Sequence, residues 1–165
     1  MNTGDVVRET IDYFGSDIRR ISHFLKVYGY AKTIGELEGL TAENQEILEV
    51  AAVLHDIGIK RAEEKYGSSA GIYQEQEGPA VAEKILIRLG YKEQLIDRVK
   101  YLIGHHHTYD KIEGIDYQIL VEADFLVNIQ EDEIKTPAIC NIREKIFRTK
   151  SGLHMLDIIF LADHS

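Results

Sequence analysis

The chain has 165 residues and a formal net charge of −9, with 44% hydrophobic and 28% charged residues. This length favours one domain, and the composition is that of an ordinary globular protein. The acidic balance argues against a general binder of nucleic-acid polymers or anionic membranes, since both need a basic surface, but it does not exclude a small phosphorylated substrate.

Neither a membrane-spanning segment nor a targeting segment is expected. No apolar stretch approaches the length that crosses a bilayer, and the first residues lack the basic-then-apolar pattern of a signal peptide. The single cysteine, Cys140, excludes an internal disulfide and a cysteine-based metal cage. We therefore expect a cytoplasmic protein.

The first predicted helix follows the capping pair Ser16-Asp17. Two apolar stripes run along it. One stripe contains Ile18, Ile21, Leu25 and Tyr28, and the other contains His23, Val27, Tyr30, Ile34 and Leu37. The second stripe places His23 in line with residues that face the core.

The next predicted helix begins at Thr41 and carries an apolar run into the pair His55-Asp56. A helix that is apolar on nearly every side is normally buried. An ionised carboxylate taken out of water is costly unless a positive group or a full set of donors meets it. A partner residue or a metal ion is therefore expected at Asp56, and Gly58 is expected to end the helix.

Helical spacing continues through the rest of the chain. Residues 60–71 indicate a short helix and a mobile loop that covers the site. Helices are expected over about 74–90, 95–106 and 115–129, with a turn at 109–114, and one or two more between Thr136 and Leu161. No alternating run predicts a strand, so the expected fold class is all-α.

Side chains that bind metals recur in these apolar settings. Imidazole and carboxylate groups suit hard or borderline divalent ions, and ligands from separate helices converge at the centre of a bundle. Six or seven ligands exceed what one ion takes when a position stays open for water, so two adjacent ions are the better count. The candidate metal ligands are His23, His55, Asp56, Glu77, His105, His106 and Asp124.

The order His23, His55-Asp56, Asp124 resembles the H…HD…D signature of the HD-domain superfamily of metal-dependent phosphohydrolases. Residues 54–58 look like the family's LHDIG segment, and residues 121–124 look like its ADxL helix. The resemblance implies that His23, His55, Asp56 and Asp124 hold a first ion.

The resemblance also implies a domain layout and a second ion. It covers about residues 16–128, so we expect one HD-type helical bundle over residues 1–165, with C-terminal helices over 131–161 packed on its core. In members with two ions, a histidine precedes a Gly-Pro or Gly-Ala step, where this chain has Glu77. Glutamate can ligate a metal but prefers harder ions.

The second set of histidines in such members follows an IxxH helix, which residues 103–106 resemble. Which two of His105, His106 and His107 are ligands stays open. Helical spacing from Val99 and Ile103 favours His106.

The implied activity is that of a phosphomonoesterase or phosphodiesterase, which cleaves a phosphate ester of a nucleotide or another small phosphorylated compound with a metal-activated water. The cofactor would be one or two divalent ions, of Mn, Fe, Co, Ni, Mg or Zn. Asp56 would orient the water, Lys60 and Arg61 would stabilise charge at phosphorus, and a histidine such as His106 would protonate the leaving group.

Other interpretations stay open. Relatives with this fold include di-iron oxygenases, and a non-catalytic signalling module would also be helical, although it would be expected to have damaged ligands. Taken alone, each motif is ordinary: Glu77 suits the first turn of a helix, and Lys60-Arg61 is more often a solvated pair. His154 and His164 lie outside the pattern and are expected at the surface. Helical domains of this size often pair, so a homodimer is among the allowed oligomeric states.

Overall fold

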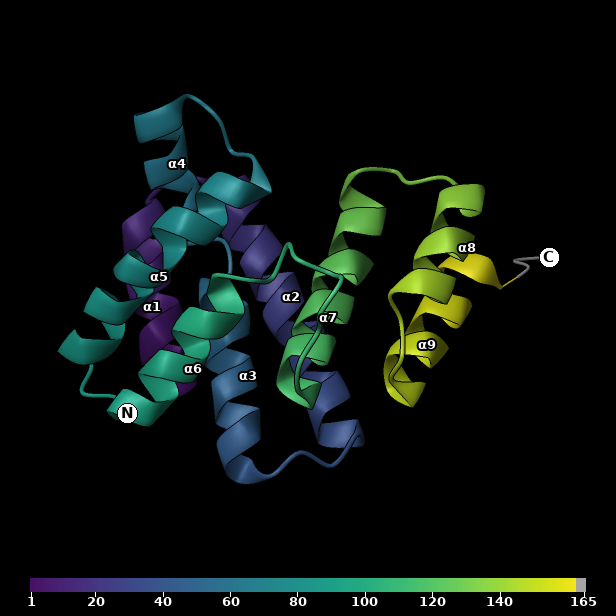
Figure 1. The fold of residues 1–165 in the computed structure, drawn as a ribbon, viewed down its shortest axis with the longest axis horizontal. Coiled ribbons are helices and arrows are strands. Elements are labelled where there is room, and N and C mark those ends of the chain that lie inside the picture. Colours follow the sequence, from purple (N-terminus) through teal and green to yellow (C-terminus); the bar gives the residue numbers. More distant parts are fainter. Residues whose placement is uncertain (163–165) are drawn as a thin grey trace.

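The computed structural model describes residues 1–162, and within them every regular element is a helix (Figure 1). The predicted all-α class is therefore confirmed. None of these helices is long and apolar enough to cross a membrane. In chain order the elements are α1 (Thr3–Phe14), α2 (Ile18–Leu37), α3 (Ala42–Leu54), α4 (Ile59–Tyr66), α5 (Gly71–Arg88), α6 (Glu93–Ile103), α7 (Ile115–Glu131), α8 (Thr136–Lys145), α9 (Lys150–Leu156) and a π-helical turn (Asp157–Leu161).

Helix α3 is the centre of the bundle and packs against α1, α2, α6 and α7 (Figure 1). Its residues from Ile47 to Leu54 are all buried. Thr41 begins the helix, because its hydroxyl accepts a hydrogen bond from the Asn44 backbone amide at 3.3 Å. The apolar run is therefore buried, as its composition predicts, and it places His55 in the interior, where the side chain is fully buried.

Helix α2 packs on α3 and α7 with the face that contains His23. Asp17 caps it, accepting a hydrogen bond from the Arg20 amide at 3.2 Å. The other predicted stripe is only half confirmed, since Ile21 and Tyr28 pack against the core whereas Ile18 is 73% exposed and Leu25 is 39% exposed. In the stripe that contains His23, Leu37 at the end of the helix is also exposed.

Two local features differ from the expectations. Helix α1, which the sequence patterns did not predict, is capped by Asn2 and buries Val6 and Phe14. Gly58 does not end α3, which stops at Leu54, but opens α4. A Cβ atom on Gly58 would lie 2.6 Å from the Gln74 carbonyl oxygen, so α5 packs directly on this backbone.

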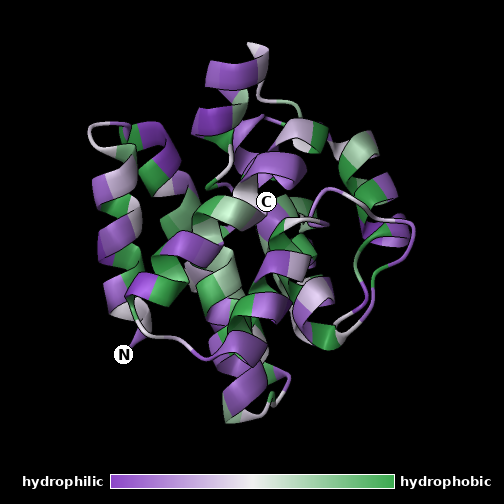
Figure 2. Cartoon of the chain, turned by 60° about the vertical axis from the view of Figure 1, so that its left-hand side comes forward, coloured by the Kyte–Doolittle hydropathy of each residue, from purple (hydrophilic) through white to green (hydrophobic). Residues whose placement is uncertain are grey.

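The C-terminal helices α8 and α9 lie at one end of the molecule beside α7 (Figure 1). Hydrophilic residues cover much of the outer faces of the helices (Figure 2). His154 is exposed, as expected, whereas His164 lies outside the described residues.

Candidate metal centre

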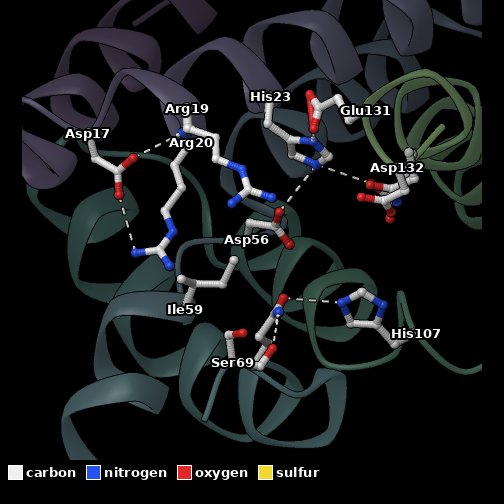
Figure 3. A pocket seen from close by; sticks show the side chains of 13 residues that line it. Asp17, Arg19, Arg20, His23, Asp56, Ile59, Ser69, His107, Glu131 and Asp132 are labelled. Atoms are coloured by element: carbon white, nitrogen blue, oxygen red, sulfur yellow. Dashed lines mark hydrogen bonds and ion pairs between the residues drawn. The ribbon is translucent and has the colours of Figure 1, made fainter. Parts of the chain in front are cut away.

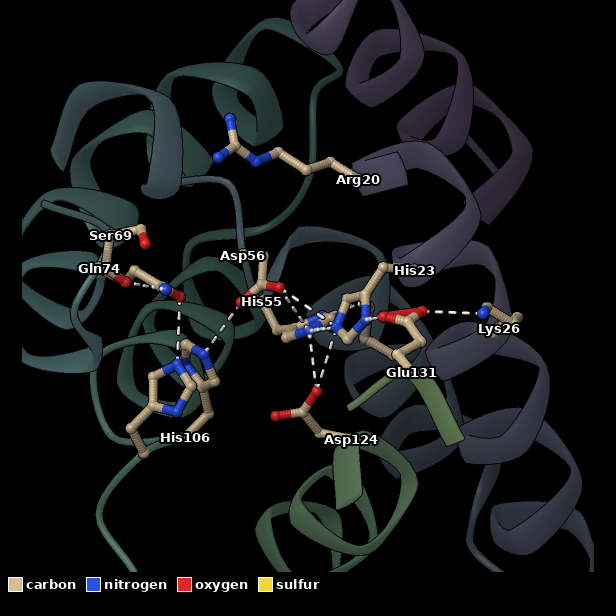
Figure 4. Close-up of polar contacts among 12 residues, drawn as sticks. Arg20, His23, Lys26, His55, Asp56, Ser69, Gln74, His106, Asp124 and Glu131 are labelled. Carbon is tan, nitrogen blue, oxygen red and sulfur yellow. Dashed lines mark hydrogen bonds and ion pairs between the residues drawn. The ribbon is translucent and has the colours of Figure 1, made fainter. Parts of the chain in front are cut away.

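Four side chains from α2, α7 and the turn after α3 meet at the centre of the bundle (Figure 4). The Nε2 atom of His23 lies 3.2 Å from His55 Nε2, 3.2 Å from an oxygen of Asp56 and 3.2 Å from Oδ1 of Asp124. His55 Nε2 lies 3.3 Å from Asp56 and 3.5 Å from Asp124. The structure therefore brings together the four residues expected around a first ion.

Asp56 connects this group to a second one. Its Oδ2 atom faces His23 and His55, and its Oδ1 atom lies 3.4 Å from His106 Nε2. Asp56 also forms a compact set of potential ligands with His106 and His107. One carboxylate thus stands between two clusters, each of a size that could hold an ion.

Three of the imidazoles are held so that their Nε2 atoms point into the centre. Each Nδ1 atom contacts an oxygen that can only accept a hydrogen bond, so Nδ1 carries a proton, and Nε2 offers a lone pair once it has released its own proton to make room for a cation. The contacts are His23 with the Glu131 carboxylate at 3.0 Å, His55 with the Ala52 carbonyl at 2.7 Å, and His106 with the Ile103 carbonyl at 2.7 Å.

Two atoms of the centre are buried without a hydrogen bond among the described residues. They are His106 Nε2 and Asp124 Oδ1, both potential metal ligands. Their neighbours lie within 3.5 Å but are not aligned as donors and acceptors. A buried polar atom without a partner is costly, and a cation bound at each of the two groups would satisfy these atoms. The residues present therefore fit a divalent ion.

The charges in the centre are strongly coupled. Burial by itself would raise the pKa of Asp56 and of Asp124, yet the facing imidazoles hold both well below their ordinary range. Burial would likewise lower the pKa of His23 and of His55, but the two carboxylates raise both values. A bound cation would replace the protons that the imidazoles otherwise keep.

His107 is held in a different way. Its Nε2 atom donates to the Gln74 amide oxygen at 3.1 Å, and the Gln74 amide nitrogen donates to the Ser69 carbonyl at 2.6 Å. Its backbone amide donates to Glu75 at 2.9 Å. Burial and the neighbouring His106 lower the pKa of His107 to about 4, so its ring is neutral at neutral pH.

Two candidate ligands do not reach the centre. His105 is exposed, and its ring donates to the Tyr101 carbonyl at 2.7 Å while stacking on the Tyr101 ring. Glu77 accepts hydrogen bonds from Lys65 at 3.0 Å and Tyr66 at 3.1 Å, on the side of α5 that faces α4. Gln74, one turn earlier on α5, is the residue that faces His107.

Lys60 also lies elsewhere. Ile59, at the start of α4, lines the pocket beside the centre, and the next residue points about 100° further round the helix. Lys60 therefore donates to the Tyr13 carbonyl at 3.4 Å and lines a separate groove with Arg61. The structure does not place either side chain where it could contact a phosphate bound at the centre.

A polar pocket of about 510 Å³ opens onto the centre (Figure 3). Sequence reasoning missed several residues that line it. The signal was available for two, since Arg19 and Arg20 precede His23 by one helical turn and share its face. The missed residues are Asp17, Arg19, Arg20, Ser69, Gln74, Asn128, Glu131 and Asp132.

Comparison with known proteins agrees with the geometry. The HD domain family matches residues 20–145, which confirms the resemblance carried by the H…HD…D order. The crystal structure of a predicted HD superfamily hydrolase from an uncultured Thermotogales bacterium is similar, with a TM-score of 0.64 at 25% identity, covering 94% of this chain and 82% of that chain. No protein with a curated description matches the chain.

Proposed function

The chain belongs to the HD domain family, and we propose that it is a metal-dependent hydrolase that cleaves a phosphate ester. The family and the similar HD superfamily hydrolase support hydrolysis. The substrate would be a nucleotide or another small phosphorylated compound.

One observation supports this proposal. The Nδ1 contacts of three imidazoles turn their Nε2 atoms toward the carboxylates of Asp56 and Asp124. Two buried atoms of this centre, His106 Nε2 and Asp124 Oδ1, have no hydrogen bond among the described residues. His23, His55, Asp56 and Asp124 would hold one ion. Asp56, His106 and His107 would hold a second. A bound divalent ion would lower the pKa of water and polarise a phosphoryl oxygen.

The chain's own residues would do the rest. Asp56 lies between the two groups and would accept a hydrogen bond from the attacking water and so orient it. The half-buried His107 ring, neutral at neutral pH, lines the pocket beside the centre. The helices around the centre keep its imidazoles out of bulk water, which strengthens every charge interaction there.

Metal analysis followed by a hydrolysis assay tests the proposal. The purified protein should contain a divalent ion, and hydrolysis of a generic ester such as p-nitrophenyl phosphate should require Mn²⁺, Co²⁺ or Mg²⁺ under anaerobic conditions, where no oxygenase turns over. Asp56→Ala should remove both bound metal and turnover. A metal-loaded Asp56→Ala protein with full activity would refute the proposal.

A matched pair of histidine variants distinguishes ligands from neighbours. His107→Ala should lower metal occupancy at the second group, whereas His105→Ala should leave occupancy and turnover unchanged, because His105 is exposed and points at Tyr101. Equal loss in the two variants would show that the effect comes from disturbing the loop and not from a ligand.

A further inference from the structure

We propose that the substrate is a small, polar phosphate monoester of the sugar-phosphate class and not a nucleotide. This inference rests on the proposed hydrolysis and narrows its substrate. It comes from the pocket that opens onto the metal centre, because that pocket decides which organic group can accompany the phosphate.

The pocket is polar and offers no surface on which a nucleobase could stack. Among the described residues that line it, Ile59 is the one apolar side chain, and none is Phe, Tyr or Trp. The whole chain contains no tryptophan. Aromatic side chains on which a base can stack are a common means by which proteins hold a base. A nucleobase in this pocket would lose its hydration without gaining such a stacking partner.

The aromatic rings nearest the pocket are already occupied. The His107 ring packs on the His106 ring with centroids 3.9 Å apart, and its Nε2 atom is held by Gln74. Tyr109, whose hydroxyl lies 3.5 Å from His107, packs its ring on Phe125 and does not line the pocket. Neither ring is free to receive a base.

Arg19 is the cation available for the phosphate. It is exposed at the pocket and makes no ion pair or side-chain hydrogen bond with the described residues, 1–162. Its neighbour Arg20 is occupied by Asp17 and Glu63. Figure 3 shows the Arg19 side chain extending toward Asp56. A guanidinium beside the centre can form two parallel hydrogen bonds with a phosphate, which Lys60 cannot do from its own groove.

Other polar side chains of the pocket suit hydroxyl groups. The carboxylates of Asp17 and Asp132 and the amide of Asn128 line the pocket, and Asn128 and Asp132 make no side-chain hydrogen bond with the rest of the described chain. Carboxylates and amides accept from and donate to sugar hydroxyls. The same carboxylates would repel a second or third phosphate, so a monophosphate fits better than a nucleoside di- or triphosphate.

A pair of esters that differ only in the base tests this inference. Ribose 5-phosphate and adenosine 5′-monophosphate share the phosphate and the sugar. With the metal-loaded protein, kcat/KM for ribose 5-phosphate should exceed that for adenosine 5′-monophosphate by about tenfold or more. Calorimetric titration should show the same order of Kd values.

Variants of Arg19 give the second readout. Arg19→Gln should lower kcat/KM for ribose 5-phosphate by roughly 10- to 100-fold, mainly through KM, while bound metal stays unchanged. Arg19→Lys should restore part of the loss. Arg8→Gln, which removes an exposed arginine of α1 outside the pocket, is the control and should have no effect.

The outcomes separate the two proposals. If both esters are hydrolysed and adenosine 5′-monophosphate is the equal or better substrate, the sugar-phosphate inference is overturned and hydrolysis stands. If neither of these two esters nor p-nitrophenyl phosphate is hydrolysed, the proposed function fails. The two Kd values from calorimetry then test the sugar-phosphate inference: tighter binding of ribose 5-phosphate supports it, and equal Kd values overturn it.

Discussion

Two buried carboxylates lie two residues apart on α7, and their surroundings differ in kind. Glu122 is fully buried and accepts four hydrogen bonds, two from backbone amides at Arg148 and Thr149 and two from the side chains of Gln118 and Thr149, at 2.6–3.2 Å. Asp124 is also buried, but it faces imidazoles, and its Oδ1 atom has no hydrogen bond among the described residues.

The difference distinguishes a carboxylate that the fold already satisfies from one that the proposed function uses as a metal ligand. Three of the four donors to Glu122 come from Arg148 and Thr149, in the segment before α9, so Glu122 fastens the C-terminal helices to the bundle. Asp124 shares its surroundings with His23 and His55, which offer lone pairs as ligands do. Burial is common to both residues, and what distinguishes them is whether their partners already satisfy them.

The largest expected effect is at Asp124. Asp124→Asn should lower metal affinity by more than the roughly 100-fold that loss of a residue behind a ligand can cost, because it removes the charge of a direct ligand. Metal titration of the variant measures this. Glu122→Gln serves as the matched control and should bind metal normally. If both variants lose metal equally, the contrast between the two sites is not real.

A smaller effect is expected one step behind the ligands. Glu131 contacts His23 Nδ1 at 3.0 Å and is itself held by Lys26 at 2.8 Å. Glu131→Gln should weaken metal binding by roughly 10- to 100-fold, since the carboxylate that fixes the ring and raises its basicity is lost. Lys26→Gln should have a much smaller effect. Metal affinity unchanged in Glu131→Gln would mean that the His23 ring is oriented by packing alone.

At Glu122 the expected loss is in stability. Glu122→Gln places an amide nitrogen among donors and should lower the free energy of unfolding by about 1–3 kcal/mol, as measured by denaturation with urea. Metal affinity should not change. A variant as stable as the wild-type protein would show that these hydrogen bonds add nothing beyond those that the groups would make with water.

The smallest effect is a pH dependence of that loss. Burial raises the pKa of Glu122 above its ordinary value of 4.5, so the folded protein binds this proton more tightly than the unfolded chain does. The resulting stabilisation is fully present below pH 4.5 and is lost as the pH rises through the raised pKa. The stability difference between wild type and Glu122→Gln should therefore shrink from pH 4.5 toward neutrality. A difference that grows over this range would indicate a lowered pKa.

The fold and the first group of ligands were accessible from the sequence because their signals are local. An apolar run that ends in His55-Asp56 can only be buried, and the spacing from His23 to Ile34 puts the imidazole on the packed face of α2. The first group of candidate ligands then lacks only one further acidic residue in an apolar helix, and Asp124 is that residue.

The second group was accessible only in part. Helical spacing from Val99 and Ile103 favours His106, and the structure brings its Nε2 atom to 3.4 Å from Asp56. Helix α6 ends at Ile103 and residues 104–107 form a turn, so helical spacing does not choose between His105 and His107. Their positions depend on distant partners: Glu75 holds the backbone of His107, and the Tyr117 hydroxyl donates to the His105 carbonyl at 2.5 Å. Likewise, Glu77 points away from the centre because Lys65 and Tyr66 of α4 donate hydrogen bonds to its carboxylate. Sequence spacing carries no record of such contacts.

The close approach at Gly58 has a consequence for any systematic mutagenesis of this chain. Alanine at position 58 would press on the carbonyl of Gln74 and the amide of Gly78, both 2.6 Å from the added carbon. The displaced segment includes Gln74, which accepts the hydrogen bond from the His107 ring. An alanine scan of activity would therefore find position 58 among the most sensitive positions in the protein. Gly58 would be mistaken for a catalytic residue, although it has no side chain that could take part in the reaction.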